Sequence, residues 1–261
     1  MRYAIVNADD FGLSSEENRI ILAAFARGVI SSATLMANMP AFAEACQAIL
    51  AQGLQGRVGL HLNLTHGSPL SAALHDCPRF CTPAGQLSLR LPLGLPRLTA
   101  RERQAVRAEM AAQWSRCLDH GVLPTHLDSH QHVHNRWALA GLVADFAARQ
   151  GVPVRLARNL GRNLGPLKHL YKWLVNRRLQ ASGGSGGSGI VFACTPRDLE
   201  DGLLAARGPV EVVVHPTLLA NGDFGDVYLA PETSLTTLLD HALKDYQRLG
   251  YAQLKARSLP T

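Results

Sequence analysis

Two adjacent carboxylates, Asp9 and Asp10, follow the first apolar run of the chain, which covers residues 2–7. Gly12 comes shortly after them and offers a turn. Because neighbouring side chains on an extended backbone point to opposite sides, we expect the two acids to do different work. One would hold a metal ion and the other would act as a base. The alternative is a helix N-cap or a solvated turn, since Asp and Gly are ordinary turn residues.

Three further stretches place polar side chains at or after apolar runs. In residues 59–65, His61, Asn63 and Thr65 share one face of an expected strand. Residues 125–134 carry an ionisable group at every second position, and these groups would form one polar ridge if the strand persists: His126, Asp128, His130, His132 and His134. Such a ridge is costly to bury without a metal ion or hydrogen-bond partners; the alternative is a solvated His-rich loop. The fourth stretch, residues 211–216, is an apolar run that ends in His215, immediately before a proline.

Together these stretches supply the groups that metal-assisted hydrolysis needs. Imidazoles and a carboxylate suit a divalent ion such as Zn²⁺. One Asp and two His would leave an open coordination position, while a spare Asp and a spare His could serve as base and acid. A metal-dependent phosphoesterase acting on an anionic substrate could use the same set. A non-enzymatic carbohydrate-binding protein would have no use for the spare Asp.

Apolar strand-like runs alternate with helix-like stretches along nearly the whole chain. The expected strands cover residues 2–7, 31–37, 57–64, 124–130, 153–157, 190–194, 210–215 and 251–255. The expected helices lie near residues 15–27, 39–52, 100–120, 135–150, 165–180, 196–206 and 232–249. This alternation predicts a parallel sheet with helices packed around it. About eight such units favour an α/β fold, a single-domain distorted (β/α) barrel over residues 1–261 with its active site at the carboxyl ends of the strands. A doubly wound open sheet is the alternative.

Two stretches interrupt the alternation. Residues 65–99 are rich in Pro, Gly, Ser and Leu, and they predict a long loop or a small excursion beside the site; loops of this length are often lids. Residues 182–189 form a Gly/Ser tract that is typical of a flexible, engineered linker. A natural low-complexity loop is the alternative, and we exclude the tract from functional reasoning.

The composition is that of a soluble globular protein, with 47% hydrophobic and 18% charged residues. We find no stretch that resembles a signal peptide or a membrane span. The five cysteines are an odd number without CxxC spacing, which favours reduced thiols in a cytoplasmic protein. The net charge of +6 would suit an anionic partner, although we expect no nucleic acid. Basic residues are enriched between Arg155 and Arg178.

The four motifs, taken in order, resemble those of the YdjC-like carbohydrate deacetylases, a family that includes chitooligosaccharide deacetylases and deacetylases of hopanoid glycolipid synthesis. The motifs are NADDFG at 7–12, GLHLNLT at 59–65, THLDSHQHVH at 125–134 and VVVHP at 212–216. Each motif alone is modest, but four in sequence with similar spacing are specific. The chain departs from the family pattern across residues 159–195, where the Gly/Ser tract interrupts it.

The resemblance implies a distorted (β/α) barrel that removes acetyl groups from an N-acetylated sugar with one divalent metal ion, Zn²⁺ or Mg²⁺. Carried over by motif, the implied metal ligands are Asp10, His61 and His130. Asp9 is the implied general base and His215 the implied general acid. The resemblance also implies that His132 and His134 bind substrate or support the ligands, and that Asp128 orients a histidine. We add Asn63 and Arg155 to this substrate-binding or supporting group from their places in the sequence. From the residues alone, Arg155 could orient a carboxylate, bind substrate or be an ordinary surface arginine.

Residues 165–180 bear on the substrate. Apolar residues recur there at helical spacing, and four basic residues lie largely elsewhere on the helix: Lys168, Lys172, Arg177 and Arg178. A basic amphipathic helix can lie on an anionic membrane at the inner membrane surface, and the substrate would then be a glycolipid rather than a soluble oligosaccharide. The alternative is a barrel helix that packs its apolar stripe inward. The oligomeric state stays open, with a homodimer as one option.

Overall fold

The structure is a computed structural model that describes residues 2–91, 97–160, 164–181, 191–204 and 208–258. The Gly/Ser tract at 182–189 lies outside the described residues.

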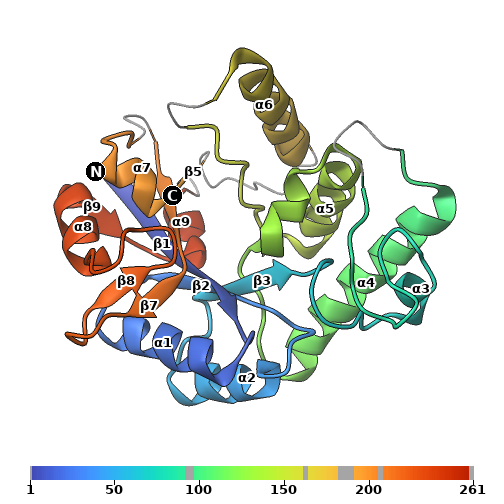
Figure 1. Cartoon of the computed structure of the whole chain (residues 1–261), viewed down its shortest axis with the longest axis horizontal. Coiled ribbons are helices and arrows are strands. Elements are labelled where there is room, and N and C mark those ends of the chain that lie inside the picture. The colour runs from blue at the N-terminus through green and yellow to red at the C-terminus, as the bar shows by residue number, and fades with distance from the viewer. Residues whose placement is uncertain (1, 92–96, 161–163, 182–190, 205–207, 259–261) are drawn as a thin grey trace.

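A parallel sheet forms the centre of the fold (Figure 1). Its strands are β1 (Arg2–Phe11), β2 (Ser32–Leu35), β3 (Val58–Leu62), β4 (Leu127–Ser129), β5 (Phe192–Cys194), β6 (Val210–Val214) and β9 (Tyr246–Arg248). The order is β4-β3-β2-β1-β6-β5, and β9 pairs with the start of β1. All the pairings in this sheet are parallel. The sheet curls into a half-barrel, so the predicted distorted (β/α) barrel is confirmed.

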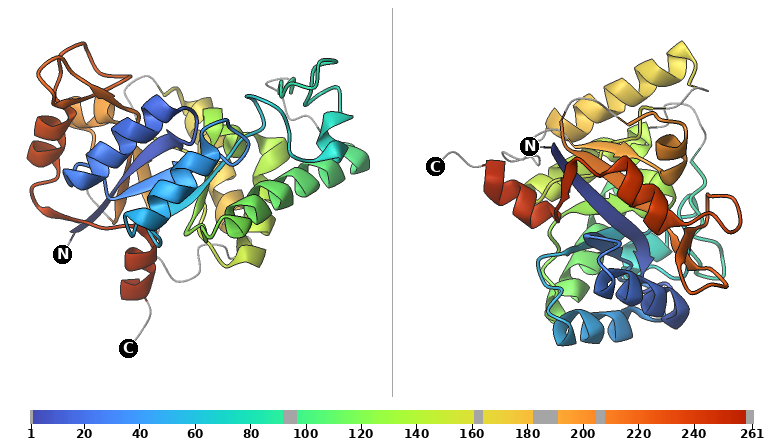
Figure 2. Two further views of the ribbon diagram at one scale, coloured as in Figure 1. Left: turned by 90° about the horizontal axis from the view of Figure 1, so that it is seen from below. Right: turned by 90° about the vertical axis from the view of Figure 1, so that its left-hand side faces the viewer.

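Helices connect most of the strands and cover the sheet (Figures 1 and 2). They are α1 (Ser15–Ala26), α2 (Phe42–Ala51), α4 (Ala100–Asp119), α5 (Trp137–Gln150), α6 (Pro166–Ala181), α7 (Pro196–Glu200), α8 (Leu235–Ala242) and α9 (Tyr251–Ser258). Two short helical segments, α3 (Ala72–His75) and η1 (His130–Asn135), and an antiparallel pair, β7 (Pro216–Leu218) with β8 (Phe224–Asp226), complete the described elements. The sequence explains the start of α4: Thr99 and Glu102 form a reciprocal capping box.

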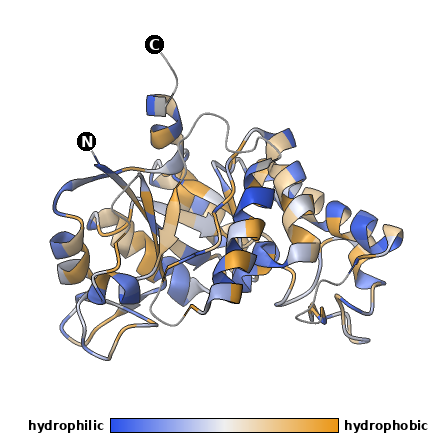
Figure 3. Ribbon diagram, turned by 90° about the horizontal axis from the view of Figure 1, so that it is seen from above, coloured by the Kyte–Doolittle hydropathy of each residue, from blue (hydrophilic) through white to orange (hydrophobic). Residues whose placement is uncertain are grey.

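The core lies between the sheet and its helices, where β-branched and aliphatic side chains are removed from water. Val210, Val212 and Val214 of β6 are buried together with Ala4, Val6 and Ala8 of β1. Figure 3 shows predominantly hydrophobic strands at the centre of the fold. Strands buried on both faces read as continuous apolar runs rather than alternating ones, which is why the sequence predicted them.

The C-terminal part of the fold differs from the prediction. The expected strand 251–255 is wrong, because these residues form α9. The expected helix 232–249 ends early: α8 stops at Ala242 and the chain then adds β9 to the edge of β1. Pairing with β1 overrides the local preference of this short segment. The expected strand 153–157 is reduced to one bridge, between Leu127 and Val154.

The excursion 65–99 is partly ordered rather than a plain loop. It contains α3 and a bridge between Cys81 and Leu87, and buried carboxylate oxygens of Glu109 on α4 accept hydrogen bonds from the backbone of Leu70 and Ser71. All five cysteines are free thiols. Across the described ranges, we find no helix with the length and apolar character needed to cross a bilayer.

Candidate active site

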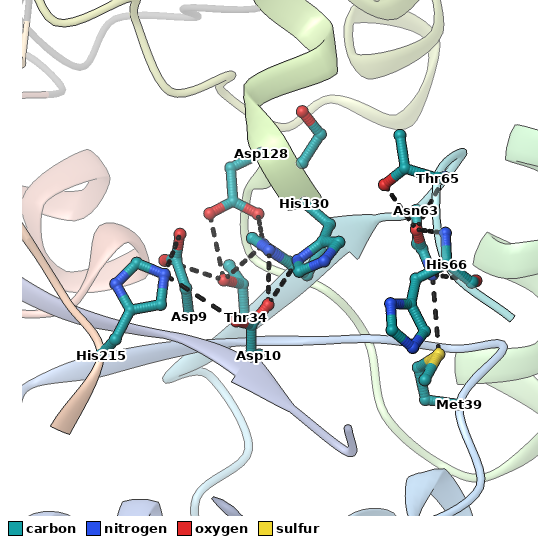
Figure 4. Close-up of polar contacts among 12 residues, drawn as sticks. Asp9, Asp10, Thr34, Met39, Asn63, Thr65, His66, Asp128, His130 and His215 are labelled. Carbon is teal, nitrogen blue, oxygen red and sulfur yellow. Dashed lines mark hydrogen bonds and ion pairs between the residues drawn. The ribbon is translucent and has the colours of Figure 1, made fainter. Parts of the chain in front are cut away.

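The polar stretches converge at the carboxyl ends of β1, β3, β4 and β6 (Figure 4). Asp9 and Asp10 both lie near the His215 ring, with carboxylate oxygens 4.0 and 3.8 Å from its Nε2. The expectation that the two acids point to opposite sides is therefore wrong. Asp10 has a φ of 67°, and the register of β1 against β2 shifts between Ala8 and Phe11. This irregularity breaks the alternation of an ideal strand and turns both carboxylates into one site.

Three of the predicted ligands form a compact group. Asp10 Oδ1 lies 3.1 Å from His61 Nε2 and 2.8 Å from His130 Nδ1. One donor atom from each residue lies within 4.8 Å of the others. Two imidazoles and one carboxylate are a donor set that Zn²⁺ accepts, and three protein ligands leave a position open. The residues present therefore fit a divalent cation.

A second layer supports this group. His61 Nδ1 lies 2.7 Å from Asp128 Oδ1, so Asp128 fixes the tautomer and orientation of the imidazole, as carboxylates behind metal-binding histidines commonly do. Burial works against a proton on His61, but the charges of Asp128 and Asp9 raise the pKa of this imidazole well above its ordinary value. A cation bound by His61 would compete with that proton.

Arg155 is the buried cation that holds the acids together. It pairs with Asp9 through two hydrogen bonds of 2.7 Å. The same guanidinium lies 2.7 Å from Asp128 Oδ2, and its Nε donates to Glu211 at 2.8 Å. Burial alone would raise the pKa of Asp9, but the charge and hydrogen bonds of Arg155 hold it well below its usual range. The alternative that Arg155 is an ordinary surface arginine is wrong, since its side chain is almost completely buried.

His215 directly follows β6 and faces the acids from the other side of the site (Figure 4). Its backbone N–H donates to Asp226 at 2.7 Å, and its ring makes an edge contact with Tyr228, with centroids 5.1 Å apart. Its Nδ1 is buried and has no hydrogen-bond partner among the described residues. The β7–β8 pair thus positions this histidine through Asp226 and Tyr228, neither of which the sequence singled out.

The predicted ridge of five ionisable groups is wrong beyond Ser129. The strand ends there, and Gln131 and His132 adopt left-handed backbone conformations inside η1. His130 therefore turns toward Asp10, while the ring of His134 is buried against Ser129 Oγ. His132 is exposed beside the site.

The remaining polar residues of these motifs are used by the fold. His126 is buried and stacks on Tyr251 with ring centroids 3.9 Å apart; burial lowers its pKa to about 3, so it is neutral. Asn63 is buried too, and its side chain hydrogen-bonds the backbone of Thr65 and His66. It holds the loop that brings His66 beside His130, with centroids 6.1 Å apart.

Thr34 on β2 is a central residue that sequence reasoning missed. Its hydroxyl lies 3.0 Å from Asp128 Oδ2, 3.1 Å from His61 Nδ1 and 3.4 Å from Asp9 Oδ1. A threonine in a strand carries no local signal of such a role, because threonine is common in strands. Its partners lie on three other strands and become visible only in the folded chain.

A cleft of about 500 Å³ opens beside these groups. Its lining includes Arg155, His132 and Tyr228 from the site, together with Lys172 of α6 and Ala193 of β5. The volume is in the range of small-ligand sites. The geometry thus combines a pair of acids of which Asp9 is buried, a candidate cation site, a facing histidine and an adjoining cleft.

Residues 3–249 match a family model described as YdjC-like protein. A chitooligosaccharide deacetylase from Escherichia fergusonii is 33% identical over 250 residues, which cover 93% of each chain. A carbohydrate deacetylase from Geobacillus stearothermophilus is 41% identical over 157 residues, 60% of this chain and 60% of that relative. A crystal structure from Enterococcus faecalis, named a putative cellobiose-phosphate cleavage protein, superimposes with a TM-score of 0.70 at 21% identity and covers 97% of this chain and 98% of its own. That likeness concerns the fold alone.

Proposed function

Because the chain belongs to the YdjC-like protein family, we propose that it is a carbohydrate N-deacetylase that hydrolyses the acetamide of an N-acetylglucosamine-type sugar. The observation that carries the proposal is the placement of Asp9 and His215 beside the Asp10, His61 and His130 group. The names of the relatives support the reaction class.

Asp10, His61 and His130 would hold the divalent cation. When bound, such an ion acts as a Lewis acid that polarises the amide carbonyl and makes water more acidic. His61 is oriented for this task by Asp128, and His130 is supplied by the turn that follows β4.

Asp9 is the group that takes a proton from the attacking water. Arg155 keeps its carboxylate ionised, because the paired charge stabilises the deprotonated form. The two hydrogen bonds from Arg155 also fix the orientation of the carboxylate. A fixed, ionised carboxylate beside the water position is what general base catalysis requires.

His215 is the group that returns a proton. Hydrolysis adds the oxygen of water to the carbonyl carbon and breaks the carbon–nitrogen bond, so the departing sugar nitrogen needs a proton to leave as an amine. His215 Nε2 faces both carboxylates at 3.8–4.0 Å, and from this position the imidazole acts as the proton donor to the departing nitrogen. The products are acetate and the free amino sugar.

The experiment is acetate release from an N-acetylglucosamine oligosaccharide, with added Zn²⁺ or Mg²⁺ and with a chelator. We expect acetate release that the chelator abolishes. Hydrolysis of a phosphodiester such as bis-p-nitrophenyl phosphate with no acetate release from N-acetylated sugars would contradict the proposal and favour a phosphoesterase.

Asp9→Asn tests the role of the base. We expect it to retain bound metal and to lower kcat by roughly 10²–10⁴-fold. Asp76→Asn is the matched control, because Asp76 is 67% exposed and remote from β1 in the sequence; it should keep full activity. Full activity of Asp9→Asn would remove Asp9 from the mechanism.

A further inference from the structure

Helix α6 presents an apolar outer face. Leu167 is 84% exposed, Leu170 53% and Trp173 47%, and Leu174 is exposed as well. On the opposite side of the helix, Val175 and Leu179 are buried in a small cluster with alanines of α5. We considered two interpretations of residues 165–180, a membrane-surface helix and a barrel helix whose apolar stripe packs inward. Only part of that stripe packs inward.

The charge around this face has one sign. Neither Asp nor Glu occurs between Asp145 and Asp198 in the sequence. Lys168 and Arg177 of α6 are exposed, and the Arg177 guanidinium lies 5.0 Å from the Trp173 ring centroid. The other two basic residues face the fold: Lys172 donates to the backbone of Arg158, and Arg178 lies over the Trp137 ring of α5. Exposed leucines and a tryptophan bordered by lysine and arginine are the composition of helices that lie in a membrane interface.

Helix α6 also adjoins the site. Lys172 lines the same cleft as His132 and Tyr228. A second hollow of about 360 Å³ is lined by Trp173, Arg177 and Phe192, and it shares Leu156 and Ala193 with the first. Trp173 and Arg177 thus border a hollow that adjoins the cleft beside Arg155 and Tyr228. Figures 1 and 2 show α6 at the outer edge of the molecule, where a flat surface can reach it.

We infer that the outer face of α6 docks on an anionic phospholipid bilayer. The apolar side chains enter the interface, and the exposed Lys168 and Arg177 contact the lipid headgroups. A second copy of the chain suits this face less well. A two-fold interface sets the same patch against itself, so the positive charges of Lys168 and Arg177 would face a helix that carries basic residues and no acidic one. The inference goes beyond the proposed deacetylation and does not depend on it.

The consequence for the reaction concerns how the substrate is presented. With α6 on a bilayer, the cleft beside His132 and Tyr228 lies close to the headgroup layer. A sugar carried on a membrane lipid then reaches Asp9 without leaving the surface.

The test is sedimentation of the full chain with vesicles of phosphatidylcholine alone and of phosphatidylcholine with phosphatidylglycerol. We expect binding to the anionic vesicles that weakens as salt is raised, because exposed charges are screened. Leu170→Gln combined with Trp173→Gln should weaken binding on the order of tenfold or more, since both side chains lose apolar area in the interface. Leu123→Gln is the matched control: Leu123 is 68% exposed but lies on another surface, after α4, and this variant should bind like the unmodified chain.

The variants change exposed side chains, so equal thermal unfolding midpoints would verify that they fold. No sedimentation of the unmodified chain with anionic vesicles would overturn the inference, as would equal binding by the double variant. A dimer in light scattering that the double variant abolishes, without vesicle binding, would assign the face to a second copy instead. None of these readouts depends on acetate release, so failure here and failure of the proposed function are distinguishable.

Discussion

Replacing Arg155 by methionine should destabilise the protein in a pH-dependent way. The guanidinium is buried and contacts Asp9, Asp128 and Glu211. Methionine preserves much of the volume but leaves three buried carboxylates without their cation. Removing one partner of a buried ion pair costs about 3–5 kcal/mol, which is a large share of a typical unfolding free energy of about 5–15 kcal/mol. We expect a loss of at least that size at pH 7.5.

The pH dependence follows from the direction of each shift. In the unmodified chain the folded-state pKa values of Asp9 and Asp128 are lowered, so these groups contribute stability above their unfolded pKa and lose it as pH falls. Without Arg155, burial raises the pKa of Asp9 instead, so the folded variant loses stability as pH rises. At pH 4.5, which is just above the ordinary pKa of an aspartate, the variant has lost most of this penalty while the unmodified chain keeps its stabilisation, so the difference in unfolding free energy between the two proteins should be larger at pH 7.5 than at pH 4.5.

The assay is urea unfolding followed by circular dichroism at both pH values, with a chelator present so that no cation compensates for the acids. Arg19→Met is the control; its ion pair with Glu16 is exposed, and the urea midpoint should not change. Arg155→Lys keeps the charge but loses the paired hydrogen bonds, so its unfolding free energy should lie between those of the unmodified chain and Arg155→Met. If Arg155→Met does not fold, Arg155→Lys provides the same test. A loss below about 1 kcal/mol at pH 7.5, or an equal loss at both pH values, would refute the assignment of Arg155 as the compensating charge.

Two further predictions concern residues behind the site. Thr34→Val removes the hydroxyl that contacts His61 and Asp128 without changing the side-chain shape, and it should lower Zn²⁺ affinity or activity by roughly 10–100-fold. The measurement is a calorimetric Zn²⁺ titration. Thr236→Val is the control, because its hydroxyl contacts Asp223 away from the site, and it should leave Zn²⁺ affinity unchanged. Gly59→Ala would place a Cβ 2.5 Å from the His126 ring and should cost about 1–3 kcal/mol by overpacking. Gly165→Ala, with open space around its position, is its control in urea unfolding, and equal midpoints for the two variants would contradict the close approach.

The sequence allowed the sheet and the meeting of the motifs to be predicted, because each motif ends an apolar run and parallel strands end at one edge. Asp10, His61 and His130 come together for this reason. Local reasoning failed where the backbone leaves its regular period, at Asp10 and at Gln131 with His132. The catalytic and ligand roles of these residues stay predictions.

Other features depend on partners that are distant in the sequence. Thr34 and Arg155 acquire their surroundings from strands that lie far along the chain. The inward side of α6 is set by the small alanines of α5, Ala140 and Ala144, and spacing within α6 does not specify it. Residues 246–248 pair as a strand only because the first residues of β1 offer them an edge.

The position of β1 in the sheet has a consequence for synthesis of the chain. β1 is made before the partners that it meets through Ala4–Ala8 on β6 and through Arg2–Ala4 on β9. Those partners leave the ribosome only after β2, β3, β4 and β5 have been made. Until then the nascent chain carries an apolar strand without its β6 and β9 neighbours, and closing so long a loop is a slow step in folding. Asp9 and Asp10 reach their final surroundings only after β6 delivers His215, so a ribosome-stalled chain ending before β6 has no assembled acid pair.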